Sequence, residues 1–114
     1  NDTRAIEAGA HAFASLRGIY SPLTHYYKSK NGNLIGEIEI PLALWIIGGM
    51  TNSHPMVKIA LKILNVESGK ELAQVAAALG LAQNLAALRA LATEGIQKGH
   101  MVLHKRKFID SDSE

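Results

Sequence analysis

The chain has 114 residues, of which 47% are hydrophobic, and its formal net charge is +2 at pH 7. This length suits one ordinary domain or part of a larger one, and the apolar content is too high for a disordered chain. The sequence contains no cysteine, which excludes a disulfide framework, a thiolate metal site and a catalytic thiol. The first residues carry no signal-peptide pattern, so we expect a cytoplasmic protein. The small charge favours neither nucleic acid nor a membrane surface as a partner, and the apolar runs break before the roughly 18 residues that a membrane span needs.

Residues 2–17 show helical spacing of apolar side chains. The residues expected on the inner face are Ile6, Ala10, Phe13 and Leu16. An N-cap is available among the first three residues, and Gly18 is suited to ending the helix. The segment therefore predicts an amphipathic helix.

The pattern changes to β-structure in residues 23–41. Two runs rich in β-formers are joined across Asn31-Gly32, a pair suited to the positive φ angles of a tight hairpin turn. In the second run Glu37 and Glu39 alternate with isoleucines, so we expect one wet face and one buried face.

Two helix starts follow the adjacent glycines Gly48 and Gly49. Pro55 suits the first turn of a helix that runs to about residue 65. Its expected buried side consists of Met56, Ile59, Ala60, Ile63 and Leu64. Ser68 and Glu71 have the spacing of a capping box and predict the start of a second helix, which we expect to stop at Gly80.

Residues 81–97 are apolar almost all round, which is typical of a helix in a protein interior or at a subunit interface. Gln83 and Asn84 are the notable exceptions, because buried amides are costly unless a partner bonds them. Gln83, Ala87 and Leu91 share one stripe, which either lines a ligand site or packs in the core. The expected fold class is α+β, with helices packed on a small antiparallel hairpin and a long, central, buried helix.

The titratable residues leave two interpretations open. His100 and His104 are four residues apart, but Met101 stands where the zinc-protease pattern requires glutamate, so we expect no metal site. His100 is either a packing histidine or an acid-base group, since the imidazole pKa of about 6.5 lies near neutrality. Asp2 is explained locally by the helix dipole and a surface ion pair.

Two further motifs are weak. The paired glycines match neither a dinucleotide fingerprint nor a phosphate-binding loop. The basic cluster at residues 104–107 is better explained as a solvated helix end than as a nucleic-acid site.

Three blocks together resemble the class II 3-hydroxy-3-methylglutaryl-coenzyme A (HMG-CoA) reductases. They are "NDTRAIEAGAHAFAS" at 1–15, "GNLIGEIEIPLA" at 32–43 and "GLAQNLAALRALATEGIQKGHMVLH" at 80–104. The resemblance implies reduction of HMG-CoA to mevalonate and coenzyme A with NADH or NADPH, or the reverse reaction, in a homodimer or larger oligomer.

The resemblance also assigns roles to particular residues. The family's Asn-Asp-x-Arg motif places its catalytic aspartate at Asp2, beside a lysine network that stabilises the carbonyl oxygen as it gains charge. The Gly-His-Met motif places the catalytic histidine at His100, which would protonate the departing coenzyme A thiolate. By the same analogy the substrate pocket is bordered by Gln83, Asn84, Ala87 and Leu91.

The resemblance further implies a division of the chain. Residues 1–104 are expected to be the C-terminal half of the large, substrate-binding and dimerisation domain, and residues 105–114 a polar tail or the truncated start of the C-terminal flap. The family's catalytic glutamate and lysine and most of its nicotinamide site precede Asp2, so we expect a fragment that is inactive by itself. Trp45 stands where the family often has a smaller residue. The alternative is a non-catalytic oligomerisation or partner-binding module derived from this family.

Overall fold

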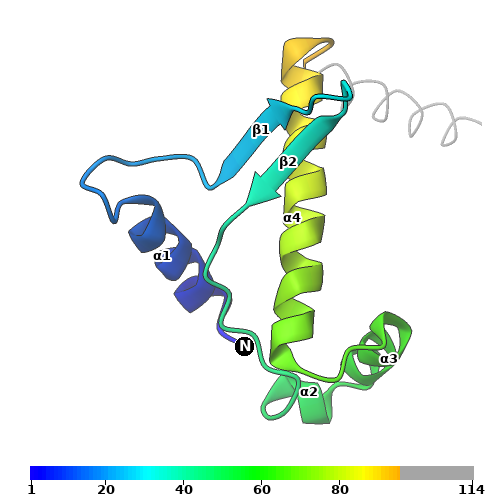
Figure 1. The fold of residues 1–114 in the computed structure, drawn as a ribbon. Helices are drawn as coiled ribbons and strands as arrows, with labels where there is room; N and C mark the ends of the chain where they lie inside the picture. Colours follow the sequence, from blue (N-terminus) through cyan, green and yellow to red (C-terminus); the bar gives the residue numbers. More distant parts are fainter. Residues whose placement is uncertain (96–114) are drawn as a thin grey trace, which may run out of the picture. The chain divides into compact units, whose positions relative to one another are not determined.

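The computed structural model describes residues 1–95 (Figure 1). The chain divides into two compact units, Asn1–Leu81 and Ala82–Glu114, and each is described by itself. The elements follow in the order helix, two strands and three helices. This composition confirms the predicted α+β class, with a two-stranded antiparallel sheet and one long helix.

The predicted N-terminal helix is α1, Thr3–Ala14. Asp2 is its N-cap, and the chain leaves the helix at Ser15 before Gly18 turns it with a φ of 76°. Ala14 is buried, and the side chains of Ile6, Ala10 and Phe13 are half-buried on the expected face. The helix is therefore amphipathic as predicted, although Leu16 lies beyond its end and is exposed.

The predicted hairpin consists of β1, Thr24–Lys28, and β2, Leu34–Ile38, paired antiparallel so that Tyr26 lies opposite Gly36. The turn differs from the predicted two-residue form. Gly32 has a φ of 83°, but Asn31 does not adopt a positive φ, and the Ser29 N–H bonds the Asn33 carbonyl at 2.8 Å. Longer hairpin loops commonly place a glycine after an ordinary turn, so one left-handed residue suffices here.

The hairpin packs on the first part of α4, Gly69–Ala92. The Tyr26 hydroxyl donates to the Leu81 carbonyl at 3.4 Å, and Gly80 lies close enough to Ile38 that a Cβ would meet its Cδ1 at 4.0 Å. The outer face is wet as expected, since Glu37 and Glu39 are exposed. Both contacts lie within the first unit, at the part of α4 that ends at Leu81.

A short helix that was not predicted, α2, Met50–Ser53, follows the paired glycines. The predicted next helix is α3, Pro55–Leu64, with His54 as N-cap and Asn65 in the left-handed region at its end. The prediction of a buried side for α3 is wrong. Met56 is 61% exposed and Ile63 is 78% exposed, because none of the described residues covers this face.

The prediction that a helix stops at Gly80 is also wrong. The capping box does start α4, with the Ser68 hydroxyl accepting from the Glu71 N–H at 3.2 Å, but the Glu71 carboxylate bonds the Glu67 N–H at 2.7 Å. The helix passes through Gly80 and ends at Ala92, where Gly95 takes a φ of 77°. Glycine inside a helix costs only about 1 kcal/mol, and the helical residues on either side of Gly80 offset that cost.

Because the two predicted helices are one, the apolar helix is longer than expected. Within the described residues, α4 is long and apolar enough to cross a membrane by length and composition alone, with a mean hydropathy of 1.4 over 18 residues. This corrects the expectation that the apolar runs are too short. Core helices of soluble proteins meet the same criterion, so the finding is weak evidence for a span.

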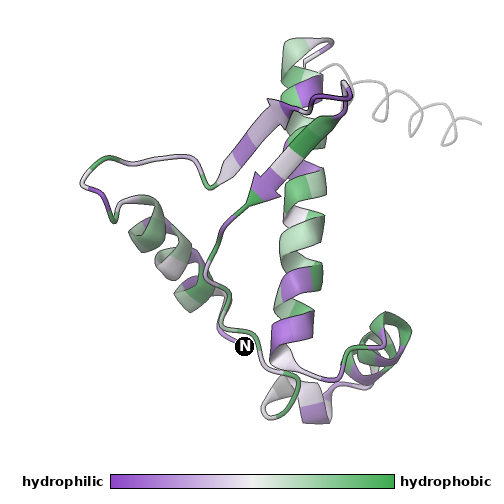
Figure 2. Ribbon diagram, in the orientation of Figure 1, coloured by the Kyte–Doolittle hydropathy of each residue, from purple (hydrophilic) through white to green (hydrophobic). Residues whose placement is uncertain are grey.

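Little of the described chain is buried. Among residues 1–95, only Ala14 and Thr51 fall in the buried class, and no residue of α4 does. The expectation of a buried central helix is therefore not met by these residues. Figure 2 shows apolar segments along α3 and α4, and several of their large apolar side chains are exposed, among them Ile63 and Leu91.

Candidate functional site

Asp2 lies at the start of α1 and caps it. Its Oδ1 accepts hydrogen bonds from the backbone N–H groups of Arg4 at 3.0 Å and Ala5 at 3.3 Å. The Arg4 side chain also reaches the same oxygen, with Nε at 3.8 Å. The helix N-terminus and the arginine both favour a negative charge at this position, which agrees with the local explanation for Asp2.

The geometry leaves part of this carboxylate free to act. The described hydrogen bonds of the Asp2 carboxylate both use Oδ1, and 61% of the side-chain surface is exposed. A carboxylate fixed through one oxygen presents the other in a defined direction. Asp2 is therefore placed to accept a hydrogen bond from a cationic side chain or a bound molecule.

The residue before Asp2 is tied to a distant segment, a contact that sequence reasoning missed. The Asn1 Nδ2 donates to the Trp45 carbonyl at 3.1 Å, and the Trp45 N–H donates to the Asn1 Oδ1 at 2.8 Å. The two residues are 44 apart, so no local pattern reveals the pair. The contact uses only the backbone of Trp45, whose side chain is exposed.

A chain of polar side chains runs from α1 to the loop behind it. His11 Nδ1 lies 2.7 Å from the Tyr20 hydroxyl, and the two rings stack. His11 Nε2 lies 3.9 Å from the carboxylate of Glu7, one turn earlier on α1. All of these side chains are exposed, and the group pins the loop after α1.

The predicted pocket residues on α4 lie in the second unit. Gln83, Ala87 and Leu91 recur every four residues and share one face, as the sequence predicts. The three are exposed, whereas Asn84 is half-buried. Asp2 belongs to the first unit, and His100 lies outside the described residues.

The first unit also has an open cavity of about 850 Å³ between the end of α1 and the hairpin. Both apolar and charged side chains line its walls, and none of the predicted site residues is among them. The lining residues are Phe13, Ala14, Leu16, Arg17, Ser21, Pro22, Leu23, Thr24, His25, Glu37, Ile38 and Glu39.

The described residues assemble neither a cluster of metal ligands nor a nucleotide-binding turn. Among residues 1–95, no three histidine or acidic side chains gather as metal ligands would. The paired glycines Gly48 and Gly49 precede a helix of only four residues, so they do not form the glycine-rich turn before a long helix that cradles a dinucleotide. The residues present do not fit a nicotinamide nucleotide by themselves.

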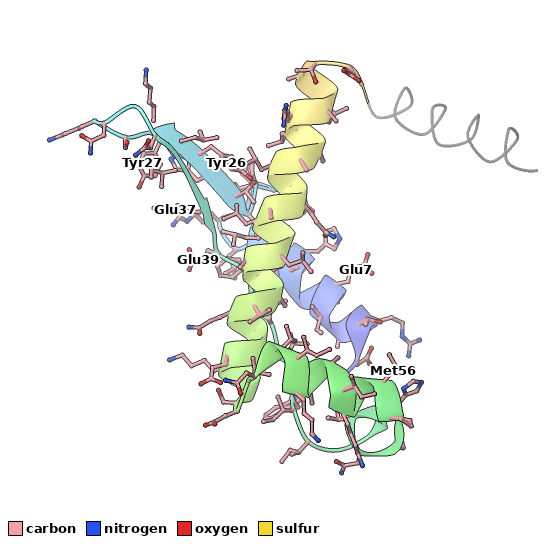
Figure 3. All side chains as sticks on the ribbon, turned by 90° about the vertical axis from the view of Figure 1, so that its right-hand side faces the viewer. Glu7, Tyr26, Tyr27, Glu37, Glu39 and Met56 are labelled. Atoms are coloured by element: carbon pink, nitrogen blue, oxygen red, sulfur yellow. The ribbon has the colours of Figure 1, made fainter. Side chains whose placement is uncertain are left out.

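One titrating group on the hairpin is perturbed. The Tyr27 hydroxyl donates to the Glu37 carboxylate at 3.1 Å, and this hydrogen bond, with the negative charge of Glu37, raises the pKa of Tyr27 (Figure 3). The pair lies on the exposed surface of the hairpin and is distant from Asp2 in sequence. We therefore regard it as a structural contact of the hairpin and not as part of the candidate site.

Comparison with known proteins identifies relatives over nearly the whole chain. The profile of the family described as hydroxymethylglutaryl-coenzyme A reductase matches residues 1–105. The 3-hydroxy-3-methylglutaryl-coenzyme A reductase of Archaeoglobus fulgidus is 65% identical over 106 residues, which are 93% of this chain and 24% of that protein. A relative from Borreliella burgdorferi is 50% identical over 109 residues, 96% of this chain and 25% of its own length.

Solved structures agree with the sequence relatives. The class II reductase of Streptococcus pneumoniae bound to NADPH in open conformations is 46% identical, with a TM-score of 0.75 over 90% of this chain and 25% of that one. A second structure of the S. pneumoniae reductase has a TM-score of 0.77. This chain thus spans about a quarter of the length of the proteins it matches, and it belongs to the hydroxymethylglutaryl-coenzyme A reductase family.

Proposed function

We propose that this chain provides part of the active site of an HMG-CoA reductase, which reduces HMG-CoA to mevalonate and coenzyme A with a nicotinamide cofactor or runs the reverse reaction. The observation that carries the proposal is the family match across residues 1–105, which includes Asp2 and the Gly-His-Met motif. Because the chain spans about a quarter of its relatives, we propose that it acts only with the remaining three quarters of such an enzyme.

The chemistry assigned to Asp2 rests on the family motif, and its geometry supports the assignment. One carboxylate oxygen is held by the α1 backbone, and the other is available to a lysine contributed by another part of the enzyme. A fixed carboxylate next to a lysine keeps that cation oriented toward the carbonyl oxygen of the substrate as the oxygen gains negative charge. Such preorganised charge is typically worth about 10²–10³ in rate.

The chemistry assigned to His100 rests on the motif alone. The thiol of coenzyme A has a pKa of about 8.5, so the thiolate leaves more easily when a proton donor stands close. We assign this donor role to His100. A positioned general acid contributes about 10²–10⁴ in rate.

The remaining expectations form part of the same proposal. Residues 1–104 would belong to the large domain, and Gln83, Asn84, Ala87 and Leu91 would border the substrate pocket. The NADPH found in the S. pneumoniae structure supports a nicotinamide cofactor, whose site would lie mostly outside this chain. We also propose a cytoplasmic enzyme that works as a dimer or larger oligomer.

The proposal is testable in a chimeric reductase. Residues 1–105 of this chain replace the corresponding segment of the A. fulgidus enzyme, and HMG-CoA-dependent oxidation of NAD(P)H is measured. We expect Asp2→Asn to lower kcat by about 10²–10³, with the helix still capped because asparagine is also a good N-cap. We expect His100→Gln to lower it by about 10²–10⁴. Full activity of both variants would refute the assignment.

A second function has a specific observation in its favour. The exposed apolar side chains of α3 and α4 suit a module that associates with other copies or other proteins without catalysis. This alternative predicts that the chimera is inactive while the chain by itself forms stable oligomers. The activity assay separates the two.

A further inference from the structure

Asn1 makes a contact that its place in the sequence does not explain. Its side-chain amide has a donor nitrogen and an acceptor oxygen, and each makes a hydrogen bond to the backbone of a single residue, Trp45. Two simultaneous hydrogen bonds fix both the position and the orientation of the amide. Alanine has neither group, and glutamine has both groups on a side chain one methylene longer, so the site is matched to asparagine.

The segment that receives Asn1 is itself held in place. The Leu44 N–H bonds the Leu42 carbonyl at 3.1 Å, and the Leu44 carbonyl oxygen faces Gly69 at the start of α4. The approach is so close that a Cβ on residue 69 would collide with that oxygen. The segment at Leu44 and Trp45 is therefore confined between Asn1 on one side and the first residue of α4 on the other.

The contact between Asn1 and Trp45 matters because it lies directly before Asp2. Asp2 follows Asn1 directly, and its extended backbone, with φ at −106° and ψ at 105°, leads from the anchored amide into the first turn of α1. Residues 1–5 are all exposed, so burial does not hold this end of the helix. Helix ends fray where tertiary contacts are few. The Asn1 pair supplies the long-range contact at this end.

We propose that Asn1 is a positioning residue, which fixes the Asp2 carboxylate by tying the start of α1 to the backbone of Trp45 and, through it, to the start of α4. The inference rests on the proposed function, since it concerns the aspartate assigned to the active site. Asn1 does not touch the substrate in this account. Its effect passes through Asp2, and small displacements of such a group are costly, with about 10²-fold lost for 1 Å.

The test is a double-mutant cycle in the chimeric reductase. Asn1→Ala is expected to lower kcat by about 10-fold or more, while KM for HMG-CoA changes much less, because binding does not depend on the direction of the carboxylate. In the Asp2→Asn background, Asn1→Ala is expected to have no further effect, since the group that it positions is already gone. Asn1→Gln should recover part of kcat.

The controls separate this mechanism from general destabilisation. Asn33→Ala alters another exposed asparagine, at the hairpin turn, and should leave kcat unchanged. Equal losses from Asn1→Ala in both backgrounds would overturn the positioning role, because a merely structural defect does not depend on Asp2. If Asn1→Ala does not fold, the same cycle is run with Asn1→Gln, whose unchanged kcat would also overturn the role.

The outcomes also distinguish this inference from the function on which it rests. Loss of activity in Asp2→Asn with full activity in Asn1→Ala rejects the inference and keeps the proposed function. Full activity in Asp2→Asn rejects the role assigned to Asp2, and full activity in both Asp2→Asn and His100→Gln rejects the proposed function, whatever Asn1→Ala does.

Discussion

Gly36 and Tyr26 face each other across the hairpin, and the ring of Tyr26 occupies the space that a side chain on residue 36 would need. A Cβ there would lie 2.8 Å from the Tyr26 Cε1, and the ring is held by its hydroxyl bond to Leu81. In the chimeric reductase, we therefore expect Gly36→Ala to lower the free energy of unfolding by about 1–3 kcal/mol, as overpacking does.

Thermal unfolding checks this prediction, and Gly9→Ala is its control. Gly9 lies inside α1, and a Cβ there would meet nothing within 4 Å. Alanine should be neutral or stabilising at that position by up to about 1 kcal/mol. Equal unfolding temperatures for the Gly36→Ala and Gly9→Ala variants would contradict the packing described for Tyr26.

The raised pKa of Tyr27 predicts how the stability of the folded chain depends on pH. Its raised pKa means that the neutral hydroxyl, which donates to Glu37, is favoured in the folded chain. Any stability from this pair is therefore present below the unfolded tyrosine pKa of about 10 and is lost as the pH rises through the folded value. Tyrosine absorbance during a pH titration should show one hydroxyl ionising at lower pH in Glu37→Gln than in the parent. An unchanged titration curve would exclude the interaction.

At the scale of elements, the start of α4 depends on one side chain. The Ser68 hydroxyl accepts from the Glu71 N–H at 3.2 Å, a contact that satisfies one of the free donors of the first turn. Ser68→Ala should lower the free energy of unfolding of the chimera by about 1 kcal/mol, whereas Ser68→Asp should retain most of it because aspartate is also a good N-cap. Denaturant unfolding measures both, and equal losses would contradict the capping role.

The elements also show where sequence patterns succeed. Local signals sufficed for α1, the hairpin and α3, since Asp2, Gly32 and Pro55 are capping or turn residues that act over a few positions. They failed at Gly80, because the effect of one glycine depends on the length of helix around it. They also failed for the exposed side of α3, because a periodic pattern indicates which face is apolar but not whether anything in this chain covers it.

The candidate site was predictable to a similar degree. The sequence placed Gln83, Ala87 and Leu91 on one face of a helix, which the structure confirms, and it identified Asp2 as a possible cap. It did not reveal the bond pair between Asn1 and Trp45, which joins residues 44 apart. The roles of Asp2 and His100 stay predictions from the family motifs.

Few side chains are buried among residues 1–95. Apolar side chains such as Ile47, Ile63 and Leu91 remain largely exposed, although their composition is that of a core. Exposed apolar surface of this extent favours association. We therefore expect the chain by itself to bind a hydrophobic dye and to associate, and the chimeric reductase to do so far less.

A matched pair of variants on α3 tests whether the apolar face of this helix causes the association. Ile63→Gln should reduce dye binding and association of the isolated chain, whereas Lys62→Gln, its exposed polar neighbour, should not. Light scattering and dye fluorescence report the two effects. Equal behaviour of both variants would show that the apolar face of α3 is not responsible.

Under the proposed function, this chain forms a catalytic part of a reductase and does not turn over substrate by itself. The most direct measurement compares HMG-CoA-dependent oxidation of NAD(P)H by the isolated chain and by the chimera that carries residues 1–105. We expect no turnover by the isolated chain, and turnover by the chimera within about 10-fold of the A. fulgidus parent, a loss that corresponds to about 1.4 kcal/mol of transition-state stabilisation. An inactive but folded chimera, or turnover by the isolated chain, would contradict it.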